Sequence, residues 1–230
     1  MKYEEIIERL ESLKSPRNVE GMARFGIRPK AKVFGVAIPD LRKIAKIIKK
    51  DHELALKLWD SKIHEARILA GMVADAEKLT AEQIKKWVSE FDSWDVCDQV
   101  CMNLFDKSKI AKAKILEFAN SKEEFVKRTA FALMAALASH DKEMKDKDFV
   151  EFFPLIKKAA VDERNFVRKA VNWALRGIGK RNVSLNAKAV KLAKKIQKIS
   201  NKVAKWIAND AIRELTSDAV QKRLKLKNGK

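Results

Sequence analysis

Residues 124–130 read Glu124-Phe125-Val126-Lys127-Arg128-Thr129-Ala130, and about 40 residues later the phrase returns as Asn165-Phe166-Val167-Arg168-Lys169-Ala170. Looser copies are Lys202-Val203-Ala204-Lys205-Trp206-Ile207-Ala208 and His64-Glu65-Ala66-Arg67-Ile68-Leu69-Ala70. Repetition at about 30 to 40 residues is typical of imperfect HEAT-like helical pairs. Such pairs bury their apolar faces against their neighbours, so the repeat predicts a superhelical solenoid.

Helical periodicity runs along nearly the whole chain, and strand signals are almost absent. We therefore predict an all-α, HEAT-like solenoid whose second helices line a concave basic groove. The predicted helical pairs are 51–60 with 63–75, 80–90 with 92–105, 108–118 with 122–139, 148–160 with 163–176, and 185–199 with 201–215. No linker-like stretch divides the chain, so we expect a single domain over residues 1–230.

Glycine and proline mark few interruptions. Residues 17–39 are rich in both and predict the one irregular region, which ends where Pro39 is expected to open a helix. Gly177 and Gly179 are expected to break the helix soon after Trp173. The basic run Lys222–Lys227 is expected to fray and to add non-specific affinity for polyanions.

The net charge of +19, in a chain with 50 Lys and Arg, places polyanions first among the partners, with nucleic acid ahead of an anionic membrane. We expect no signal peptide, because the N-terminus lacks an apolar segment, and no membrane span, because no apolar run approaches the ~20 residues required. We therefore expect a cytoplasmic protein. Neither a metal site nor a disulfide framework is expected from Cys97 and Cys101, and no nucleotide-binding motif suggests a cofactor.

One helical turn separates Trp94 from Asp98, at the shoulder of the apolar face of the 92–105 helix, where Phe105 is also expected. In a strongly basic chain, a carboxylate beside an aromatic would repel DNA unless it has chemistry to perform. Asp98 is therefore the catalytic candidate. The alternative is a surface aspartate beside a half-buried tryptophan.

Arg128 lies in the predicted 122–139 helix and is followed by an uncharged run from Thr129 to Ala138, and the small residues on its face, Ala132 and Ala135, leave room for a phosphate. The alternative is an arginine paired with an acid from the adjacent repeat. Lys127 precedes it and joins the candidate phosphate contacts.

Trp173 borders the core stripe of the 163–176 helix and is flanked by Lys169 and Arg176. An aromatic between cations can pack on a sugar or base while the cations hold phosphate oxygens. Arg168 belongs to the same candidate set. The alternative for Trp173 is a core-filling role.

Three segments in order resemble the bacterial HEAT-like-repeat DNA alkylation repair glycosylases, the AlkD-type family, and the resemblance runs through essentially the whole chain. They are Phe34-Gly35-Val36-Ala37-Ile38-Pro39-Asp40-Leu41-Arg42-Lys43-Ile44-Ala45-Lys46, Ser93-Trp94-Asp95-Val96-Cys97-Asp98, and Phe166-Val167-Arg168-Lys169-Ala170-Val171-Asn172-Trp173-Ala174-Leu175-Arg176.

The resemblance implies a C-shaped solenoid that excises cationic N3- and N7-alkylated purines from double-stranded DNA without flipping the base. It implies that Asp98 is the catalytic aspartate, that Trp94 and Trp173 are groove tryptophans, and that Arg128 is the groove arginine. Asn165 departs from the pattern, because close members carry an aromatic residue there.

Two alternatives from other classes remain. One is a non-catalytic HEAT-repeat binder of damaged or branched DNA that uses the same groove. The other is a protein-binding HEAT scaffold whose basic surface serves another purpose. A monomer is expected in each case.

Overall fold

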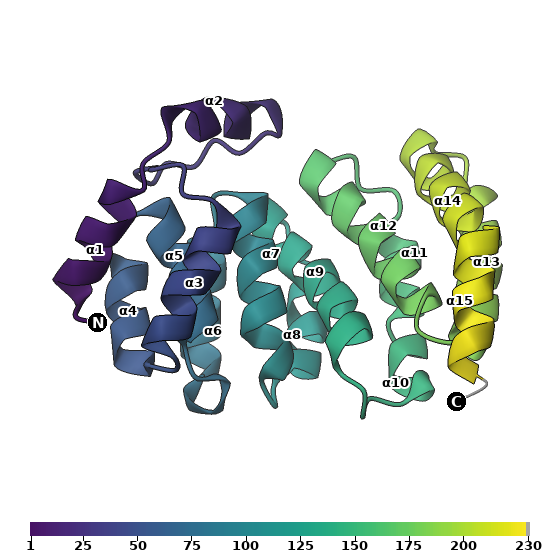
Figure 1. Ribbon diagram of the computed structural model, residues 1–230. Coiled ribbons are helices and arrows are strands. Elements are labelled where there is room, and N and C mark those ends of the chain that lie inside the picture. Colours follow the sequence, from purple (N-terminus) through teal and green to yellow (C-terminus); the bar gives the residue numbers. More distant parts are fainter. Residues whose placement is uncertain (229–230) are drawn as a thin grey trace. The chain divides into compact units, whose positions relative to one another are not determined.

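The computed structural model describes residues 1–228 as helices joined by loops, and no strand occurs in that range (Figure 1). The chain forms two compact units, Met1–Lys109 and Ile110–Lys230, and each is described by itself. The all-α prediction is confirmed, and the single domain over residues 1–230 remains a prediction. No helix within residues 1–228 is both long and apolar enough to cross a membrane.

The first unit contains α1 (Tyr3–Ser12), α2 (Pro16–Arg24), α3 (Ile38–Ile48), α4 (His52–Asp60), α5 (His64–Val73), α6 (Ala81–Ser89) and α7 (Trp94–Asn103), with short 3₁₀-helices η1 (Ala76–Lys78) and η2 (Phe105–Lys107). The predicted helices 51–60, 63–75, 80–90 and 92–105 are confirmed as α4, α5, α6 and α7, and α4 packs against α5 as a pair. Pro39 lies in the first turn of α3, as expected.

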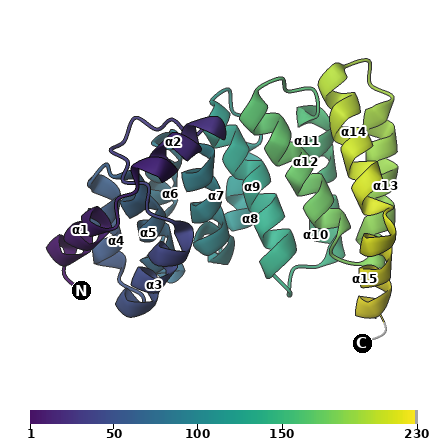
Figure 2. The same ribbon diagram turned by 45° about the horizontal axis from the view of Figure 1, so that its top comes forward.

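The expectation of an irregular region over residues 17–39 is wrong in its first part, which forms α2. Ser15 caps this helix by accepting a hydrogen bond from the Asn18 amide, and Pro16 occupies its first turn. No residue of α2 is buried. Both views place α2 across the ends of the other helices of its unit (Figures 1 and 2).

Aromatic side chains form the core between α4 and α6. The rings of Trp59 and Trp87 stack with their centroids 4.1 Å apart, and Phe91 meets Trp59 edge-on at 5.8 Å. Phe105 is also buried, 6.5 Å from Trp87. The expectation that Phe105 lies at the shoulder of α7 is therefore wrong, because α7 ends at Asn103 and η2 turns Phe105 inward.

The second unit contains α8 (Ala111–Phe118), α9 (Glu124–His140), α10 (Asp146–Val150), α11 (Phe153–Ala159), α12 (Asn165–Gly179), α13 (Val183–Gln197), α14 (Lys202–Leu215) and α15 (Asp218–Asn228). The predicted helix 148–160 is divided into α10 and α11. Pro154 explains the division, because a proline ring clashes with the carbonyl four residues earlier and interrupts a helix. The other predicted pairs of this unit are confirmed.

Helix α9 has the longest buried run of the second unit. Every residue from Arg128 to Ala138 is buried, and the helix packs against both α8 and α12. Helices that are apolar on all sides are buried on all sides. The uncharged run therefore determines which helix is buried most completely.

Helix α12 runs through Gly177 and ends at Gly179, so the expected break is wrong at Gly177, whereas the helix does end at Gly179. Close packing also accounts for Gly179, since a Cβ at that position would lie 2.7 Å from the side chain of Leu215 on α14. At Gly177 a Cβ would lie 3.5 Å from the backbone of Ala135 on α9, which is ordinary contact. Gly179 thus permits the close approach of α14 at the last residue of α12.

The expected fraying of Lys222–Lys227 is also wrong, because this run lies within α15. Val220 and Leu224 are buried and attach α15 to α13 and α14. Figure 2 shows α13, α14 and α15 together at the C-terminal end of their unit.

Candidate nucleic-acid interface

Helix α7 begins at Trp94 and carries Asp98 one turn later, and both side chains are partly exposed. The opposite face of the helix, with Cys97, Val100 and Cys101, is buried, as the spacing predicts. Both cysteines are free thiols. The structure therefore places the two candidate side chains beside each other on the accessible part of one helix.

The indole of Trp94 is held by the loop that follows α2. Its Nε1 donates a hydrogen bond to the carbonyl oxygen of Phe25 at 3.1 Å. The Phe25 side chain itself is 71% exposed, so an aromatic ring stands in solvent next to the candidate site. Sequence reasoning missed Phe25, and an aromatic beside Gly26 in a Gly-rich and Pro-rich segment is the signal that could have found it.

Two acidic side chains, Asp92 from the loop before α7 and Glu65 from α5, hold the rest of this loop. Asp92 accepts a hydrogen bond from the Lys30 amide at 2.7 Å. The buried carboxylate of Glu65 accepts from the amides of Phe34 at 3.0 Å and Gly35 at 2.6 Å. Gly35 has φ of +78°, and a Cβ there would lie 2.4 Å from the Ser15 carbonyl oxygen, so the turn requires glycine.

A buried histidine and aspartate connect α5 to the first turn of α7. His64 Nε2 lies 2.8 Å from Asp95 Oδ2, and the His64 side chain has no exposed surface. Burial disfavours the imidazolium, but the hydrogen bond and charge of Asp95 outweigh it and raise the pKa of His64. In the same way, His64 overcomes the effect of burial and lowers the pKa of Asp95. This pair positions the residue next to Trp94.

In the second unit, Arg128 is buried and reaches from α9 to α12. Its Nη1 donates a hydrogen bond to the Phe166 carbonyl oxygen, and the rings of Phe125 and Phe166 stack with centroids 5.7 Å apart. Arg128 therefore has a structural contact with the repeated phrase of the next helical pair. Its role towards a phosphate stays a prediction.

Lys127 forms an ion pair instead of extending into solvent. Its Nζ lies 2.8 Å from Asp162, which Arg164 also contacts at 2.6 Å. Burial favours a neutral Asp162, but the two cations outweigh it and hold the pKa of the carboxyl well below its usual range. Any phosphate that binds Lys127 must compete with Asp162.

The cations of α12 differ in their surroundings. Lys169 is exposed, whereas the Arg168 guanidinium lies over the Trp206 ring at 5.6 Å. Arg176 is paired with Glu214 and, at 3.4 Å, with Asp210. Lys169 is thus the most accessible of the three cations.

Trp173 lies on the same helix and is partly exposed, so it is not simply core filler. Its position one turn from both Lys169 and Arg176 agrees with the predicted face. The structure brings the α12 residues together on one helix and Trp94 with Asp98 on another, each within its own unit.

A basic cluster that the sequence analysis did not select lies at the C-terminal end of α3. Arg42, Lys46, Lys49 and Lys50 line a cavity of about 380 Å³. Lys50 donates to the Ala74 carbonyl oxygen at 2.7 Å, where α5 ends. Burial and a nearby lysine lower the pKa of Lys50. The helix dipole favours cations near a helix C-terminus and accounts for part of this cluster. Four cations together also suit the binding of a phosphate.

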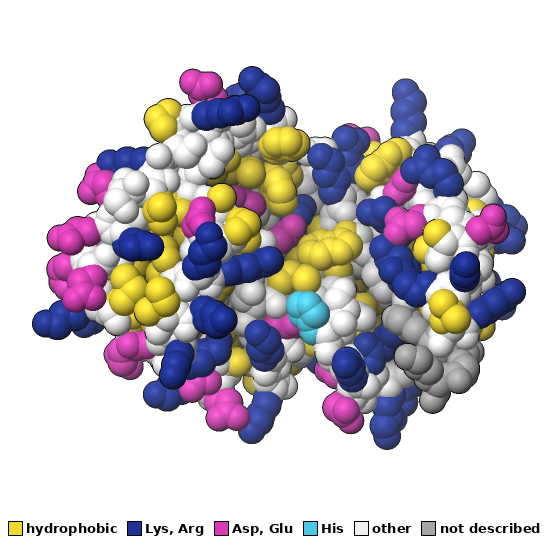
Figure 3. All heavy atoms as spheres, in the orientation of Figure 1, with side chains coloured by type: hydrophobic (Ala, Val, Ile, Leu, Met, Phe, Trp, Pro, Cys, Tyr) yellow, Lys and Arg dark blue, Asp and Glu magenta, His cyan; other side chains and the backbone are white. Residues whose placement is uncertain are grey.

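Charge on the molecular surface has an uneven distribution. Lys and Arg side chains spread over both units on the face shown in Figure 3, whereas Asp and Glu side chains gather over α1. The acidic residues of α1 are Glu4, Glu5, Glu8 and Glu11. The first unit thus carries its own cluster of acidic charge, away from α7 in sequence.

Repeated helical pairs that pack on one another define the class of HEAT-like helical-repeat proteins. A solved structure with TM-score 0.77 and 22% identity supports this fold over 93% of this chain and 95% of that one. That structure represents a family of proteins related to the HEAT-like repeat DNA glycosylases with affinity for branched DNA structures. The predicted HEAT-like fold is confirmed.

The chain belongs to the DNA alkylation repair enzyme family, whose model matches residues 6–215. An uncharacterized protein of Listeria innocua is 22% identical over 200 residues, which cover 86% of this chain and 87% of that protein. A second, from Listeria monocytogenes, is 30% identical over 95 residues, or 40% of this chain and 42% of that protein. The predicted family is confirmed, and the roles of the individual residues stay predictions.

Proposed function

We propose that the protein is a DNA glycosylase that hydrolyses the N-glycosidic bond of cationic N3- and N7-alkylated purines in duplex DNA. The observation that carries the proposal is the pair on α7, where Asp98 lies one turn from Trp94 at the accessible part of the helix. The net charge of +19 supports a polyanionic ligand. A family of DNA alkylation repair enzymes supplies the context for the chemistry.

The chemistry requires few groups because the substrate is already activated. A purine alkylated at N3 or N7 carries positive charge, so it leaves as a neutral base without protonation by a general acid. As the C–N bond breaks, the sugar becomes an oxocarbenium-like cation. Asp98 would stabilise that charge and orient the water that adds to the anomeric carbon, as carboxylates do in glycoside hydrolysis.

The remaining candidates would hold the DNA. We assign Trp94 and Trp173 to the lesion-bearing sugar and backbone, because aromatic faces pack on sugars and favour nearby cations. Lys169, which is exposed, would bind phosphate directly, as would the α3 cluster. Arg128, Lys127, Arg168 and Arg176 belong to the same proposal, although Lys127 and Arg176 already contact carboxylates in the free protein. The proposed enzyme acts as a cytoplasmic monomer without a cofactor.

A second candidate function is non-catalytic binding of branched DNA. It is favoured by the similar structure from a family with affinity for branched DNA structures. Such a binder would use the same basic residues. It would need no carboxylate at Asp98.

The decisive experiment measures release of 7-methylguanine and 3-methyladenine from methylated duplex DNA by the wild type and by Asp98→Asn. Asp60→Asn is the matched control, since Asp60 is 61% exposed and belongs to the same unit. We expect release by the wild type and the control, and none by Asp98→Asn with DNA still bound. Normal excision by Asp98→Asn would refute the site assignment.

Binding to a four-way junction separates the second candidate. If the wild type releases no base, binds the junction tightly and binds it as well or better after Asp98→Asn, the protein is a branched-DNA binder. Affinity that is weak and nearly independent of salt would instead indicate a protein-binding scaffold, because each phosphate contact adds to the salt dependence.

A further inference from the structure

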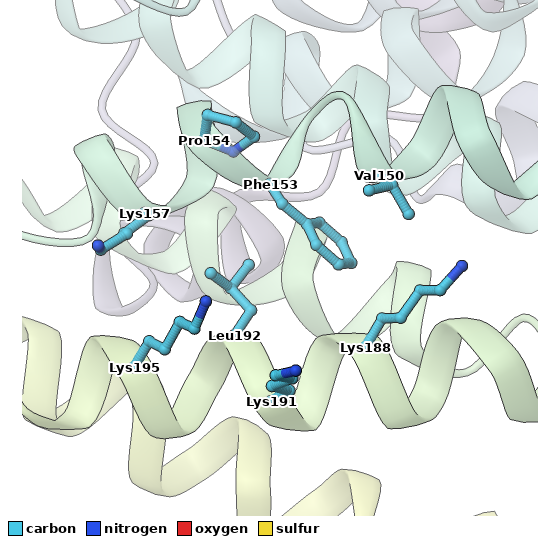
Figure 4. Close-up of a pocket in the computed structure, with 8 residues that line it drawn as sticks. All are labelled: Val150, Phe153, Pro154, Lys157, Lys188, Lys191, Leu192 and Lys195. Carbon is cyan, nitrogen blue, oxygen red and sulfur yellow. The ribbon is translucent and has the colours of Figure 1, made fainter.

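A cavity of about 460 Å³ lies between α11 and α13 of the second unit, and we name it the α11–α13 pocket. Its floor is apolar and consists of Val150, Phe153, Pro154 and Leu192. Leu192 is only 7% exposed, whereas Val150 and Phe153 are partly exposed and Pro154 is exposed. Phe153 points from the start of α11 towards Leu192 on α13 (Figure 4). The volume lies within the range of ordinary ligand sites.

The position of Phe153 is fixed by the core beneath it. Its neighbours in the chain, Phe149 and Phe152, are fully buried and pack edge-on at 6.3 Å. The guanidinium of Arg181 lies 4.7 Å over the Phe149 ring. These contacts hold the corner between α10 and α11, so Phe153 remains partly exposed at the pocket instead of completing the core.

Lysines surround the apolar floor. Lys157 and Lys195 lie at one end of the pocket, Lys188 lies at the other, and Lys191 lies between them (Figure 4). All four side chains are exposed. No acidic residue lines the pocket, so its charge is of one sign.

Carboxylates are absent from this part of the sequence. Residues 164–209 contain thirteen Lys and Arg and no Asp or Glu. Asp148 and Glu151, which are close in sequence to Val150 of the pocket, both contact Lys112, at 2.7 and 2.8 Å. No ion pair joins the pocket lysines to any residue in the described part of the chain.

This arrangement opposes the stability of α13. Lys191 lies three residues after Lys188 and four before Lys195, and like charges at these spacings destabilise a helix. An anionic ligand would relieve the repulsion. The apolar floor would at the same time be removed from water.

We infer that the α11–α13 pocket binds an acidic segment of a partner protein that inserts one or two apolar side chains. Carboxylates on the segment meet the four lysines, and the apolar side chains fill the floor beside Phe153 and Leu192. DNA fits the observations less well, because a phosphate backbone leaves an aliphatic floor unused and one phenyl ring stacks a single base. A membrane fits less well because Leu192, which forms part of the floor, is only 7% exposed.

The site is separate from the proposed glycosylase residues, since none of its lining residues belongs to α7, α9 or α12. A partner bound here would bring the protein to another assembly without occupying Trp173 or Lys169. The inference therefore stands or falls independently of catalysis.

Fluorescence polarisation with a labelled synthetic peptide tests the inference. The probe has four aspartates followed by leucine and phenylalanine, and in a matched peptide both apolar residues are serine. We expect the serine peptide to bind at least about tenfold more weakly, because each buried apolar side chain contributes about 1.5–3 kcal/mol. Unlabelled oligothymidylate and vesicles of phosphatidylglycerol serve as competitors.

Charge-reversal variants locate the site. Lys191→Glu/Lys195→Glu changes two exposed pocket residues and should weaken the probe at least about tenfold. Lys194→Glu/Lys198→Glu has the same charge change and spacing outside the pocket, with Lys194 on α13 and Lys198 at its C-cap, and should change affinity less than about threefold. Circular dichroism checks that both variants fold.

Three results would overturn the inference. They are equal binding of the two peptides, equal loss in the two double variants, and displacement of the probe by oligothymidylate or vesicles at lower concentration than by unlabelled peptide. The first would leave only non-specific charge attraction, and the last would assign the pocket to nucleic acid or lipid.

Discussion

Removing the Glu65 carboxylate should release the loop that supports Trp94. Glu65 is 1% exposed and lies on α5, where it accepts hydrogen bonds from the amides of Phe34 and Gly35 at 3.0 and 2.6 Å. The loop leading to α3 carries Phe25, whose carbonyl oxygen accepts the Trp94 hydrogen bond. One buried side chain therefore connects the core of the first unit to the candidate site.

The expected magnitude comes from the two donors. A hydrogen bond to a charged acceptor contributes about 1.5–3 kcal/mol, and a buried donor left without a partner costs about 1–3 kcal/mol. When the loop relaxes, water reaches the two amides and restores part of the lost free energy of unfolding. We expect Glu65→Ala to lower the free energy of unfolding by about 3–4 kcal/mol. Glu65→Gln should lose about 2 kcal/mol, because the amide keeps one acceptor and turns its NH₂ towards the other donor.

Urea unfolding followed by circular dichroism measures the loss, and hydrogen exchange of the Phe34 and Gly35 amides locates it. Glu8→Gln is the control, since Glu8 is exposed and should change stability by less than about 0.5 kcal/mol. A loss below about 1 kcal/mol in Glu65→Ala, with both amides still protected, would refute the reasoning. The loop would then be held by its backbone bonds to Ser15 and Lys62.

Three further outcomes are expected. Because folding raises the pKa of His64 above 6.5, the contribution of His64 to the free energy of unfolding is fully present below pH 6.5 and is lost as pH rises through the folded pKa. Asp95→Asn should therefore reduce the fall of the free energy of unfolding with pH, measured by urea unfolding between about pH 6 and 9. An unchanged pH dependence would contradict the prediction. Lys127→Ala should lower the free energy of unfolding by about 1–2 kcal/mol at pH 7, where Asp162 is ionised. The loss should be smaller in acid, where the Asp162 carboxyl, despite its lowered pKa, takes up a proton, and thermal unfolding at neutral and at acidic pH tests this. Trp173→Ala should weaken binding to methylated duplex DNA about tenfold in polarisation assays while the melting temperature stays nearly unchanged, and equal affinity would remove Trp173 from the interface.

Local patterns were sufficient to predict most of the fold. The 3.6-residue periodicity located the paired helices, and the uncharged run after Arg128 identified the most buried helix. These features depend on residues close in sequence, where the spacing of the apolar side chains determines which face of a helix is buried. The same reasoning placed Trp94 and Asp98 on one accessible turn of α7.

Contacts between distant residues could not be predicted in the same way. The hydrogen bond from Trp94 to Phe25 spans 69 residues, and that from the Gly35 amide to Glu65 spans 30. Gly179 appeared to be a helix breaker, although its small size serves the close approach of Leu215. In each case a partner elsewhere in the chain overrides the local preference of the residue.

The carboxylate of Asp98 distinguishes the two proposed functions physically. On a surface that only binds DNA, an aspartate repels the phosphates and lowers affinity, so its removal should be neutral or favourable. In a glycosylase the same charge acts on a cation that exists only as the glycosidic bond breaks, so it contributes to the transition state more than to binding. Neutralising Asp98 therefore changes affinity and excision in different directions. Affinity alone cannot identify the enzyme, whereas the two measurements on one variant can.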